Sequence, residues 1–277
     1  MYKIVAKKKL SEFVELMTVE APFVAARCEP GQFVIVSTGE NGERIPLTIQ
    51  DYDRKKNTVN IIYQIVGYST KEISLLKEGD FLDVFLGPLG KPAHYKAEGK
   101  PSRVLGIGGG VGIAPLYPQI RELKREGAKV DVILGGRTAE LVILQNEFHE
   151  LVDNLYYATN DGSLGTTGLV TDVLNELIQK GEKYDLVICI GPVVMMRAVV
   201  EVTKKLGIPT NVSLNPIMVD GTGMCGGCRV SVGGETKFAC VDGPDFDGLE
   251  VDYDELMRRQ SFYREEEHNC RLKGEAK

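Results

Sequence analysis

Three cysteines and one aspartate near the end of the chain have the types and spacing of metal-cluster ligands. Cys225 and Cys228 are separated by two residues, and Cys240 follows after eleven more. This spacing matches the C-x4-C-x2-C…C pattern of plant-type [2Fe-2S] proteins if Asp220 takes the place of the first cysteine. Glycines between these positions keep bulky side chains away and leave backbone N–H groups free for the cluster sulfurs. The pattern therefore predicts a [2Fe-2S] cluster held by Asp220, Cys225, Cys228 and Cys240.

The same residues allow two other interpretations. Three thiolates and a carboxylate could form a tetrahedral structural zinc site, although zinc ribbons usually pair two Cys-x-x-Cys knuckles and this segment has one. Alternatively, the cysteines bind no metal, and Asp220, which precedes Gly221, is a turn residue. A tight cysteine cluster in a chain without an export signal favours metal binding over disulfide bonds.

A glycine-rich segment joins an apolar run to a helical pattern within residues 104–126. Its centre reads G-G-x-G-x-x-P from Gly109 to Pro115, close to the G-x-G-x-x-G of dinucleotide-binding loops but with Val111 in place of the last glycine. Such a loop lets the backbone approach a pyrophosphate, and the following helix, which we expect to begin at Pro115, offers unpaired N–H groups. The alternative is a tight turn that needs glycine for packing alone.

Two stretches in the first hundred residues suggest a further binding site. Residues 44–49 have the pattern of a strand, and Gly67 to Thr70 marks a step from strand to helix. The start of that helix would offer N–H groups to phosphate oxygens. Taken alone, both stretches are equally typical of ordinary strand and cap residues.

The apolar pattern divides the chain into four parts. Residues 1–100 contain short apolar runs, beginning with Phe13–Glu20, between Gly- and Pro-containing turns, which predicts a small antiparallel β-barrel. Residues 101–213 alternate strands with helices, which predicts a doubly wound parallel sheet. Residues 214–250 are rich in Gly and Cys and show little regular periodicity, and residues 251–277 form a charged tail.

Composition excludes several classes of protein. The 277 residues carry a formal net charge of -6, which argues against a nucleic-acid-binding protein, because such proteins need basic surfaces. No run approaches the roughly 18 apolar residues of a membrane span, and Met1–Leu10 lacks the apolar core of a signal peptide. We therefore expect a cytoplasmic protein with no nucleic-acid or membrane partner.

The order of the motifs along the chain resembles one family. The motifs are R-x-P-L-T, V-G-x-S-T, G-P-L-G, G-G-x-G-x-x-P, T-N-D-G-S, C-x-G-P-x-x-M and the cysteine cluster. Together they resemble the ferredoxin-NADP reductase superfamily, in which a flavin-binding barrel precedes a nicotinamide-binding domain. Residues 1–250 are most similar to the electron-transfer subunit of dihydroorotate dehydrogenase and its relatives, which include the small subunit of NADH-dependent reduced ferredoxin:NADP oxidoreductase, also called sulfide dehydrogenase subunit beta.

The resemblance implies cofactors and assigns residues to them. The cofactors are FAD, a [2Fe-2S] cluster and NAD(H), with NADP(H) as the alternative nucleotide. The flavin would contact Pro46, Leu47, Thr48, Tyr63, Gln64, Ser69 and Thr70. The phosphate loop of the nicotinamide nucleotide would consist of Gly109, Gly110, Gly112 and Pro115. The adenosine ribose would face Arg137 and Thr138, and the nicotinamide side of the cleft would contain Asn160, Asp161, Gly191, Pro192 and Met195.

Two positions depart from the family pattern. The superfamily motif R-x-[aromatic]-[Ser/Thr] places the hydroxyl three residues after the arginine, whereas Thr48 follows Arg44 by four and Ile45 occupies the matching site. Because a shift of one residue on a strand reverses the face of a side chain, Arg44 is not assigned to the flavin phosphates. Asp220 stands where the dihydroorotate branch has cysteine, which favours the ferredoxin:NADP branch.

The function implied by the resemblance is that of a flavin- and iron–sulfur-dependent oxidoreductase subunit. NAD(P)H would reduce FAD, and electrons would pass through the [2Fe-2S] cluster to a larger flavin- and [4Fe-4S]-containing subunit. The complex would couple NADH, NADPH and ferredoxin, and electron bifurcation is one form of that coupling. Arg137 suits a 2′-phosphate whereas Glu140 repels one, and the family branch favours NAD(H) on this subunit.

Two alternatives to this function stay open. One is an electron-transfer subunit of dihydroorotate dehydrogenase, and the other, of a different class, is a zinc-stapled nucleotide-binding regulatory module. The tail after Val251 either docks on the larger subunit or forms a solvated terminal helix.

Overall fold

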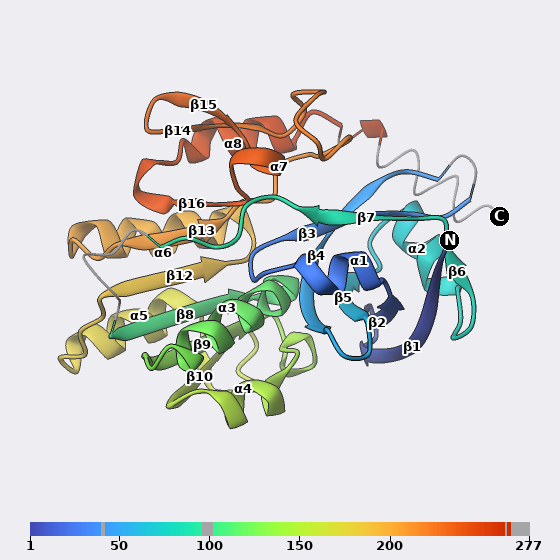
Figure 1. Ribbon diagram of the computed structural model, residues 1–277. Helices are drawn as coiled ribbons and strands as arrows, with labels where there is room; N and C mark the ends of the chain where they lie inside the picture. The colour runs from blue at the N-terminus through green and yellow to red at the C-terminus, as the bar shows by residue number, and fades with distance from the viewer. Residues whose placement is uncertain (40–41, 96–101, 264, 267–277) are drawn as a thin grey trace.

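The computed structural model describes residues 1–39, 42–95, 102–263 and 265–266. This part of the chain forms an antiparallel barrel, a parallel α/β sheet and a small C-terminal segment, which confirms the predicted fold class (Figure 1). The barrel lies to the right of the view, the parallel sheet to the left, and the C-terminal segment along the top. No helix among the described residues is long and apolar enough to cross a membrane.

Seven antiparallel strands form the barrel in the order β6-β1-β2-β5-β4-β3-β7. The two strands at the ends of this order, β6 and β7, are separated in the chain by Asp83 alone, so the sheet curls until it nearly closes. Fully buried apolar side chains, such as Ile4, Met17 and Ile61, fill the interior. The elements are β1 (Tyr2–Ser11), β2 (Val14–Glu20), α1 (Pro22–Arg27), β3 (Phe33–Ser37), β4 (Ile45–Asp53), β5 (Thr58–Gln64), α2 (Tyr68–Leu75), β6 (Phe81–Leu82) and β7 (Val84–Leu89).

The second sheet has the order β11-β10-β9-β8-β12-β13-β16 and is parallel except for β16. Side chains of β8 alternate between its faces, so that Val104 packs with α3 and α4 whereas Leu105 packs with α5 and α6. Helices therefore cover both faces of the sheet, as predicted. The elements are β8 (Arg103–Gly109), η1 (Gly110–Gly112), α3 (Ile113–Arg125), β9 (Lys129–Gly136), η2 (Ala139–Leu141), α4 (Gln145–Leu151), β10 (Asn154–Thr159), β11 (Thr166–Thr167), α5 (Val170–Gln179), β12 (Leu186–Ile190), α6 (Val193–Lys205) and β13 (Thr210–Ser213).

The C-terminal segment contains regular elements despite the weak periodicity of its sequence. A hairpin, a short helix and a strand follow the cysteine motif, and the strand β16 extends the parallel sheet beside β13. The sequence of this segment shows little regular periodicity because these strands are too short to give a clear alternation of apolar residues. The elements are β14 (Arg229–Val232), β15 (Glu235–Phe238), α7 (Ala239–Asp242), β16 (Asp245–Asp247), η3 (Gly248–Glu250) and α8 (Tyr253–Gln260).

The charged tail begins as the amphipathic helix α8. Its Tyr253 and Leu256 are buried in the same apolar cluster as residues of α6 and β14. Asp252 caps this helix, because its carboxylate accepts a hydrogen bond from the Glu255 amide. The first part of the tail therefore packs on the protein, while residues 267–277 lie outside the described residues.

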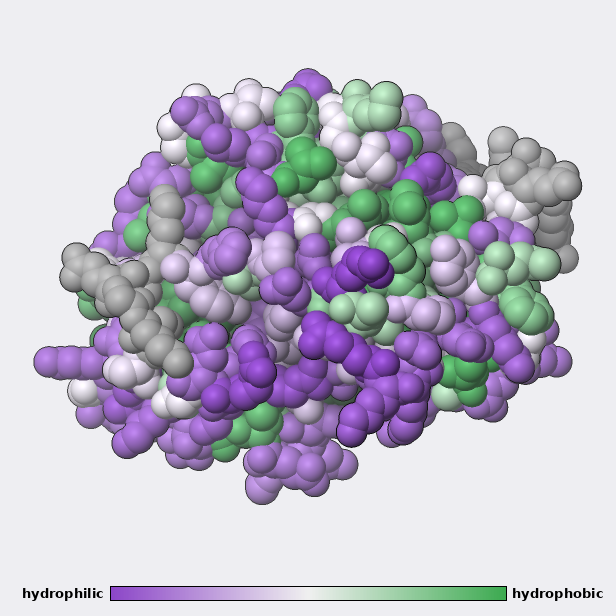
Figure 2. All heavy atoms as spheres, in the orientation of Figure 1, coloured by the Kyte–Doolittle hydropathy of each residue, from purple (hydrophilic) through white to green (hydrophobic). Residues whose placement is uncertain are grey.

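The three parts share apolar contacts. Val14 and Ile62 of the barrel belong to the same buried cluster as α3, and Phe33 and Ile35 of β3 belong to the cluster that contains Cys228 and Cys240. Figure 2 shows a mostly hydrophilic lower surface, whereas apolar residues gather toward the top of the view, where the C-terminal segment meets the barrel.

Candidate redox site

The predicted flavin strand β4 lies beside β3. Pro46 pairs with Ile35 and Thr48 pairs with Phe33. Leu47 packs against the apolar interior of the barrel. Because side chains alternate along a strand, Pro46 and Thr48 lie on the opposite face from Leu47. These two half-buried side chains can line a flavin.

Tyr63 and Gln64 differ in what they can offer a cofactor. Tyr63 is buried in the barrel core, and its hydroxyl donates a hydrogen bond of 2.6 Å to the Glu15 carboxylate. Burial and this hydrogen bond both raise the pKa of Tyr63. Gln64 ends β5 and is partly exposed. Tyr63 therefore supports the barrel from within, and its contact with a flavin stays a prediction.

The start of α2 has the geometry of a phosphate site. The Thr70 hydroxyl accepts hydrogen bonds from the amides of Gly67 at 3.1 Å and Val66 at 3.0 Å, so this side chain caps the helix. The Ser69 hydroxyl donates to the Glu43 carboxylate. The first N–H groups of a helix have no partner within it, and the space beside Gly67 is open. Backbone amides here can hold the flavin diphosphate.

The glycine loop after β8 contains two closely packed glycines and one glycine beside open space. A Cβ on Gly109 would overlap the Met195 sulfur, and one on Gly112 would overlap the Ile190 carbonyl. Gly110 has φ +56° and faces open space. Packing thus explains two of the glycines, whereas the third leaves room for a phosphate. The helix begins at Ile113, so the expectation that it starts at Pro115 was wrong.

The glycine loop meets a second loop at the carboxyl ends of β8 and β12. These strands are neighbours, and the chain leaves them in opposite directions across the sheet, which is where doubly wound folds bind ligands. Gly191 lies against the Met195 side chain. The backbone amide of Met195 donates a hydrogen bond of 2.9 Å to the Pro192 carbonyl. The structure therefore brings together Gly109, Gly112, Gly191, Pro192 and Met195, and their role in one nucleotide site stays a prediction.

The residues predicted near the ribose and nicotinamide also lie at this edge. The Asp161 amide donates to the Arg137 carbonyl at 3.3 Å, and Thr138 precedes η2. The Ser163 hydroxyl donates to the Asp161 carboxylate at 2.6 Å, and this bond lowers the pKa of Asp161. Asn160 is joined to the end of β9 through its amide. The Ala139 amide also donates to the Ser163 hydroxyl at 2.8 Å, so backbone and side-chain hydrogen bonds hold the two loops together.

Backbone amides donate hydrogen bonds to two of the cysteine sulfurs. The Gly227 amide donates to the exposed Cys225 sulfur at 3.4 Å, and the Cys240 amide donates to the buried Cys228 sulfur at 3.5 Å. The Gly227 hydrogen bond lowers the pKa of Cys225. Burial and the neighbouring Cys228 raise the pKa of Cys240 to about 12. Thiols met by N–H donors suit a cluster whose sulfurs also accept hydrogen bonds.

The cysteine segment (residues 214–244) has a geometry that differs from that of a closed zinc site. A tetrahedral zinc ion needs four ligand atoms around one point. Among the described residues, no three His, Cys, Asp or Glu side chains converge in this way. A [2Fe-2S] cluster has two irons, each with its own pair of protein ligands, and Cys228 beside Cys240 provides one such pair. This pair of cysteines fits one iron of a binuclear cluster.

Asp220 forms a turn at the start of this segment. Its carboxylate accepts hydrogen bonds from the Thr222 hydroxyl and from the Thr222 amide, the latter at 2.9 Å. These bonds lower the pKa of Asp220, so the carboxylate carries its charge at neutral pH. The turn interpretation thus describes its hydrogen bonds, and its role as a cluster ligand stays a prediction.

Two contacts near this segment have no signal in the sequence motifs. The Arg44 guanidinium donates to the Asp220 carbonyl at 3.2 Å, and Gly221 packs against Ile35 of β3 and Leu89 of β7. These residues lie far apart in the sequence, so spacing could not have revealed the contacts. They attach the cysteine segment to the barrel.

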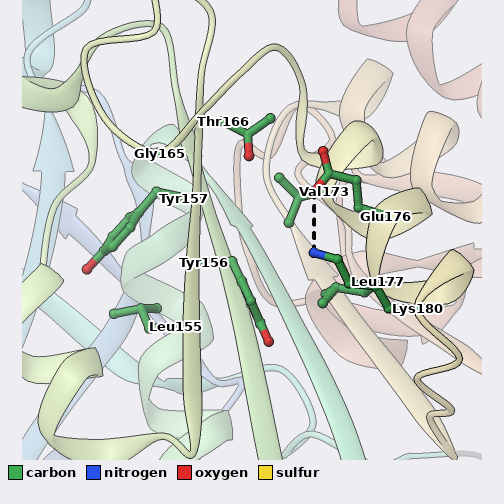
Figure 3. Close-up of a pocket in the computed structure, with 9 residues that line it drawn as sticks. All are labelled: Leu155, Tyr156, Tyr157, Gly165, Thr166, Val173, Glu176, Leu177 and Lys180. Carbon is green, nitrogen blue, oxygen red and sulfur yellow. Dashed lines mark ion pairs between the residues drawn. The ribbon is translucent and has the colours of Figure 1, made fainter.

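A separate cavity of about 300 Å³ lies between β10, β11 and α5 (Figure 3). The Lys180 ammonium and the Glu176 carboxylate are 3.8 Å apart beside it. None of the nine residues that line it in the described structure is predicted to bind a cofactor. The cavity is therefore distinct from the candidate redox site.

Comparison with known families identifies two domains of the chain. Residues 107–201 match the oxidoreductase NAD-binding domain, and residues 215–252 match the iron-sulfur cluster binding domain of dihydroorotate dehydrogenase B. The chain is 52% identical over 280 residues to an uncharacterized protein in the adh 3′ region of Clostridium beijerinckii, covering 99% of this chain and 95% of that protein. It is 46% identical over 265 residues to a dihydroorotate dehydrogenase B (NAD(+)) electron transfer subunit homolog of Thermotoga maritima, covering 96% and 92%.

A solved structure of a related oxidoreductase also matches the chain over its whole length. The chain matches a structure of NADH-dependent reduced ferredoxin-NADP oxidoreductase, studied for flavin-based electron bifurcation, with a TM-score of 0.93 and 43% identity, covering 100% of this chain and 98% of that one. The barrel, the doubly wound sheet and the cysteine segment define a flavin- and nicotinamide-dependent oxidoreductase with an iron–sulfur cluster. The chain belongs to the family of dihydroorotate dehydrogenase B electron-transfer subunits and their homologues, which work with FAD, NAD(H) and a [2Fe-2S] cluster.

Proposed function

We propose that this chain is the small subunit of a cytoplasmic ferredoxin:NADP oxidoreductase complex, in which it takes electrons from NADH and passes them to a larger flavin- and [4Fe-4S]-containing subunit. The order of three neighbouring regions carries this proposal. The nucleotide loop η1 contacts β5, β4 follows β5 in the sheet, and the cysteine segment packs on β3. A nucleotide, a flavin and a cluster in these regions would lie in the order of electron flow.

The residues of the chain hold the cofactors in this order. A bound FAD would supply the chemistry that links two-electron hydride transfer from the nicotinamide to single-electron transfer toward the [2Fe-2S] cluster. Gly110 allows the backbone of η1 to approach the nucleotide pyrophosphate. Pro46 and Thr48 present one face of β4 to the flavin ring, and the first turn of α2 binds its diphosphate through backbone amides.

The cysteine segment offers an exit for electrons. Cys225 is exposed, and the adjacent Met224 and nearby Val219 are 88% and 58% exposed. Exposed apolar side chains around a predicted cluster ligand suit a protein surface that another subunit covers. We infer that the larger subunit binds here and that ferredoxin reacts with the complex through that subunit.

Purification of the native complex tests this function. We expect the chain to co-purify with a larger subunit, to release FAD on acid extraction and to contain two iron atoms in its own cluster. NADH should reduce the flavin in the isolated chain. A protein that contains zinc, or that lacks flavin after reconstitution has been attempted, would contradict the proposal.

The nucleotide preference is a separate point. Arg137 could bind a 2′-phosphate, but Glu140 lies in η2 directly beyond it, and both Glu140 and the nearby Asp161 carry negative charge. We propose that this subunit uses NAD(H) and that the larger subunit uses NADP(H). Dye reduction by the isolated chain should be faster with NADH than with NADPH, and a tenfold preference for NADPH would overturn the assignment.

A second candidate is the electron-transfer subunit of a dihydroorotate dehydrogenase. The match of residues 215–252 to the iron-sulfur domain of dihydroorotate dehydrogenase B favours it. The two candidates differ in the larger subunit. Reduction of the native complex by dihydroorotate would establish the second candidate, whereas NADPH formation that depends on NADH and reduced ferredoxin would establish the first.

A further inference from the structure

The contact between Arg44 and Asp220 joins the predicted flavin strand to the predicted cluster segment. Arg44 immediately precedes β4, which carries Pro46 and Thr48, and its Nη2 donates a hydrogen bond of 3.2 Å to the backbone carbonyl of Asp220. The two residues are 176 positions apart in the sequence. The bond therefore belongs to the tertiary structure and joins two sites predicted to hold different cofactors.

Arg44 and the neighbouring Glu43 make their hydrogen bonds with different parts of the protein. The carboxylate of Glu43 accepts a hydrogen bond from Ser69 in the first turn of α2, where backbone amides can bind phosphate. Arg44, one residue later, instead contacts the cysteine segment. Adjacent residues thus reach two different sites, which agrees with the displacement of Arg44 from the arginine position of the superfamily motif.

The segment that Arg44 contacts rests directly on the barrel. Gly221 has φ +82°, and a Cβ at this position would lie 2.7 Å from the Ile35 Cγ1 atom of β3. This close approach fixes the backbone between Asp220 and Thr222, where the Asp220 carboxylate is already held by Thr222. The Arg44 hydrogen bond adds a polar contact to this packing, so the turn is attached to the barrel at two points.

The Arg44 charge also lies close to the Asp220 carboxylate. The guanidinium that donates to the Asp220 carbonyl at 3.2 Å places its positive charge beside this residue. A guanidinium keeps its positive charge across the pH range of proteins. A fixed positive charge favours the reduced form of a nearby redox centre, which gains negative charge on reduction.

We propose that Arg44 is a positioning residue for the [2Fe-2S] cluster, which holds the Asp220 turn against the flavin barrel and raises the reduction potential of the cluster. This inference rests on the proposed function, because it requires that the cysteine segment binds the cluster. Arg44 has no direct part in flavin binding in this scheme. Its loss should therefore affect one cofactor and leave the other unchanged.

The test compares three variants of the full-length chain after cofactor reconstitution. Arg44→Gln removes the charge but keeps a hydrogen-bond donor, and Arg44→Lys keeps the charge. Arg54→Gln is the matched control, because Arg54 is also in the barrel and donates to a backbone carbonyl, that of Cys28, at 3.2 Å. The measurements are redox titration of the cluster by paramagnetic resonance, redox titration of the flavin, and the dissociation constant of FAD.

We expect Arg44→Gln to shift the cluster toward its oxidised form by about twofold to fivefold, or about 20 to 40 mV at 59 mV per tenfold change. Arg44→Lys should recover most of this shift, and Arg54→Gln should have the wild-type potential. The flavin potential and FAD affinity should be unchanged in all three variants. Loss of the cluster from Arg44→Gln alone, with retention in Arg44→Lys, would also support the proposal.

Three results would overturn the inference. These are an unchanged cluster potential in Arg44→Gln, an equal shift in Arg44→Lys and Arg44→Gln, and a tenfold weaker binding of FAD in Arg44→Gln. Amide exchange at residues 220–223 in the cofactor-free chain gives a second readout, and equal protection in wild type and an Arg44→Ala variant, which has no side-chain donor, would exclude the tethering role. A wild-type chain that binds no cluster would instead contradict the proposed function, so the two failures are distinguishable.

Discussion

The nucleotide loop and the cysteine segment are both glycine-rich turns, but the protein holds them in different ways. In the nucleotide loop, Gly109 and Gly112 are closed in by Met195 and the Ile190 backbone. In the cysteine segment, Cys225 is exposed, and the turn before it depends on contacts with distant barrel residues. The first loop is positioned by the sheet that carries it, whereas the second is positioned by another part of the molecule. Mutations should therefore affect the first through packing and the second through its ligands and attachments.

The largest expected effect follows removal of the Asp220 carboxylate. Asp220→Ala should lose most of its iron, because one of four predicted ligands is removed, while Asp220→Cys should retain the cluster with a different spectrum and potential, because thiolate is a softer donor than carboxylate. Iron content and paramagnetic resonance measure both outcomes. If both variants keep the wild-type spectrum and potential, Asp220 is a turn residue alone, as its hydrogen bonds to Thr222 would also allow.

The buried Asp245 connects the two regions and should make stability depend on pH. It lies in β16, after the cysteine segment, and its Oδ2 accepts a hydrogen bond of 2.9 Å from Gln119 of α3, the helix after the nucleotide loop. Its Oδ1 is buried and has no hydrogen-bond partner among the described residues. Burial raises the pKa of Asp245 to about 7. The folded protein therefore favours the neutral carboxylic acid.

The sign of this pH dependence follows from the raised pKa. Between about pH 4, where an unfolded Asp titrates, and about pH 7, the folded state binds more protons than the unfolded state, so the free energy of unfolding falls as the pH rises. Asp245→Asn removes this term and should be more stable than wild type above pH 7, by at most about 4 kcal/mol. Urea unfolding of the cofactor-free chain at pH 5 and pH 8 measures the difference. Equal pH dependence in both proteins would show that Asp245 is ionised when folded.

A smaller effect is expected when the nucleotide loop is overpacked. Gly112→Ala would place a Cβ against the Ile190 carbonyl and 2.7 Å from the Gly191 Cα atom, so the backbone must shift. Overpacking of this kind costs about 1–3 kcal/mol. Gly110→Ala is the control, because its Cβ would meet no atom and the variant carries the strain of a positive φ alone. Thermal unfolding of each variant is compared with wild type, and wild-type stability in Gly112→Ala would show that the loop relaxes freely.

The smallest effect concerns the ion pair between the barrel and α3. Arg121 Nη1 and Asp51 Oδ1 are 2.6 Å apart, and both side chains are partly exposed. Exposed ion pairs contribute about 0–1 kcal/mol, so Asp51→Asn should lower stability by less than 1 kcal/mol and should leave both cofactors bound. A double-mutant cycle with Arg121→Gln measures the coupling. A coupling well above 1 kcal/mol would mean that the two parts of the fold depend on this pair.

The sequence predicted the architecture because most strands have strong local signals. The run Phe13–Glu20 corresponds closely to β2, and the predicted strand–helix alternation reappears in the parallel sheet. β1 had no such signal, since its lysines at positions 7–9 interrupt the apolar pattern. β16 was missed because Asp245–Asp247 is only three residues long, which is too short to show periodicity.

The candidate site could be predicted only where its residues are close in sequence or belong to family motifs. Motif spacing selected the cysteines and the nucleotide glycines as candidates, and the resemblance added Pro46 and Thr48. The contact of Arg44 with Asp220, by contrast, arises when β4 and the cysteine segment fold side by side. The network around Asp245 likewise depends on burial by three separate parts of the chain, which no spacing can reveal.

The pairing of β13 with β16 gives the cysteine segment the layout of an insertion. The chain leaves the sheet at Ser213 and returns at Asp245, and these two residues are direct partners across adjacent strands. Neighbouring strands lie about 4.8 Å apart, so a short turn can span the gap that residues 214–244 now fill. The cysteine segment is therefore a loop between two paired strands, and its buried Cys228 and Cys240 pack in the same apolar cluster as the sheet. A substitution inside this loop can change the cluster ligands without changing the pairing of β13 with β16.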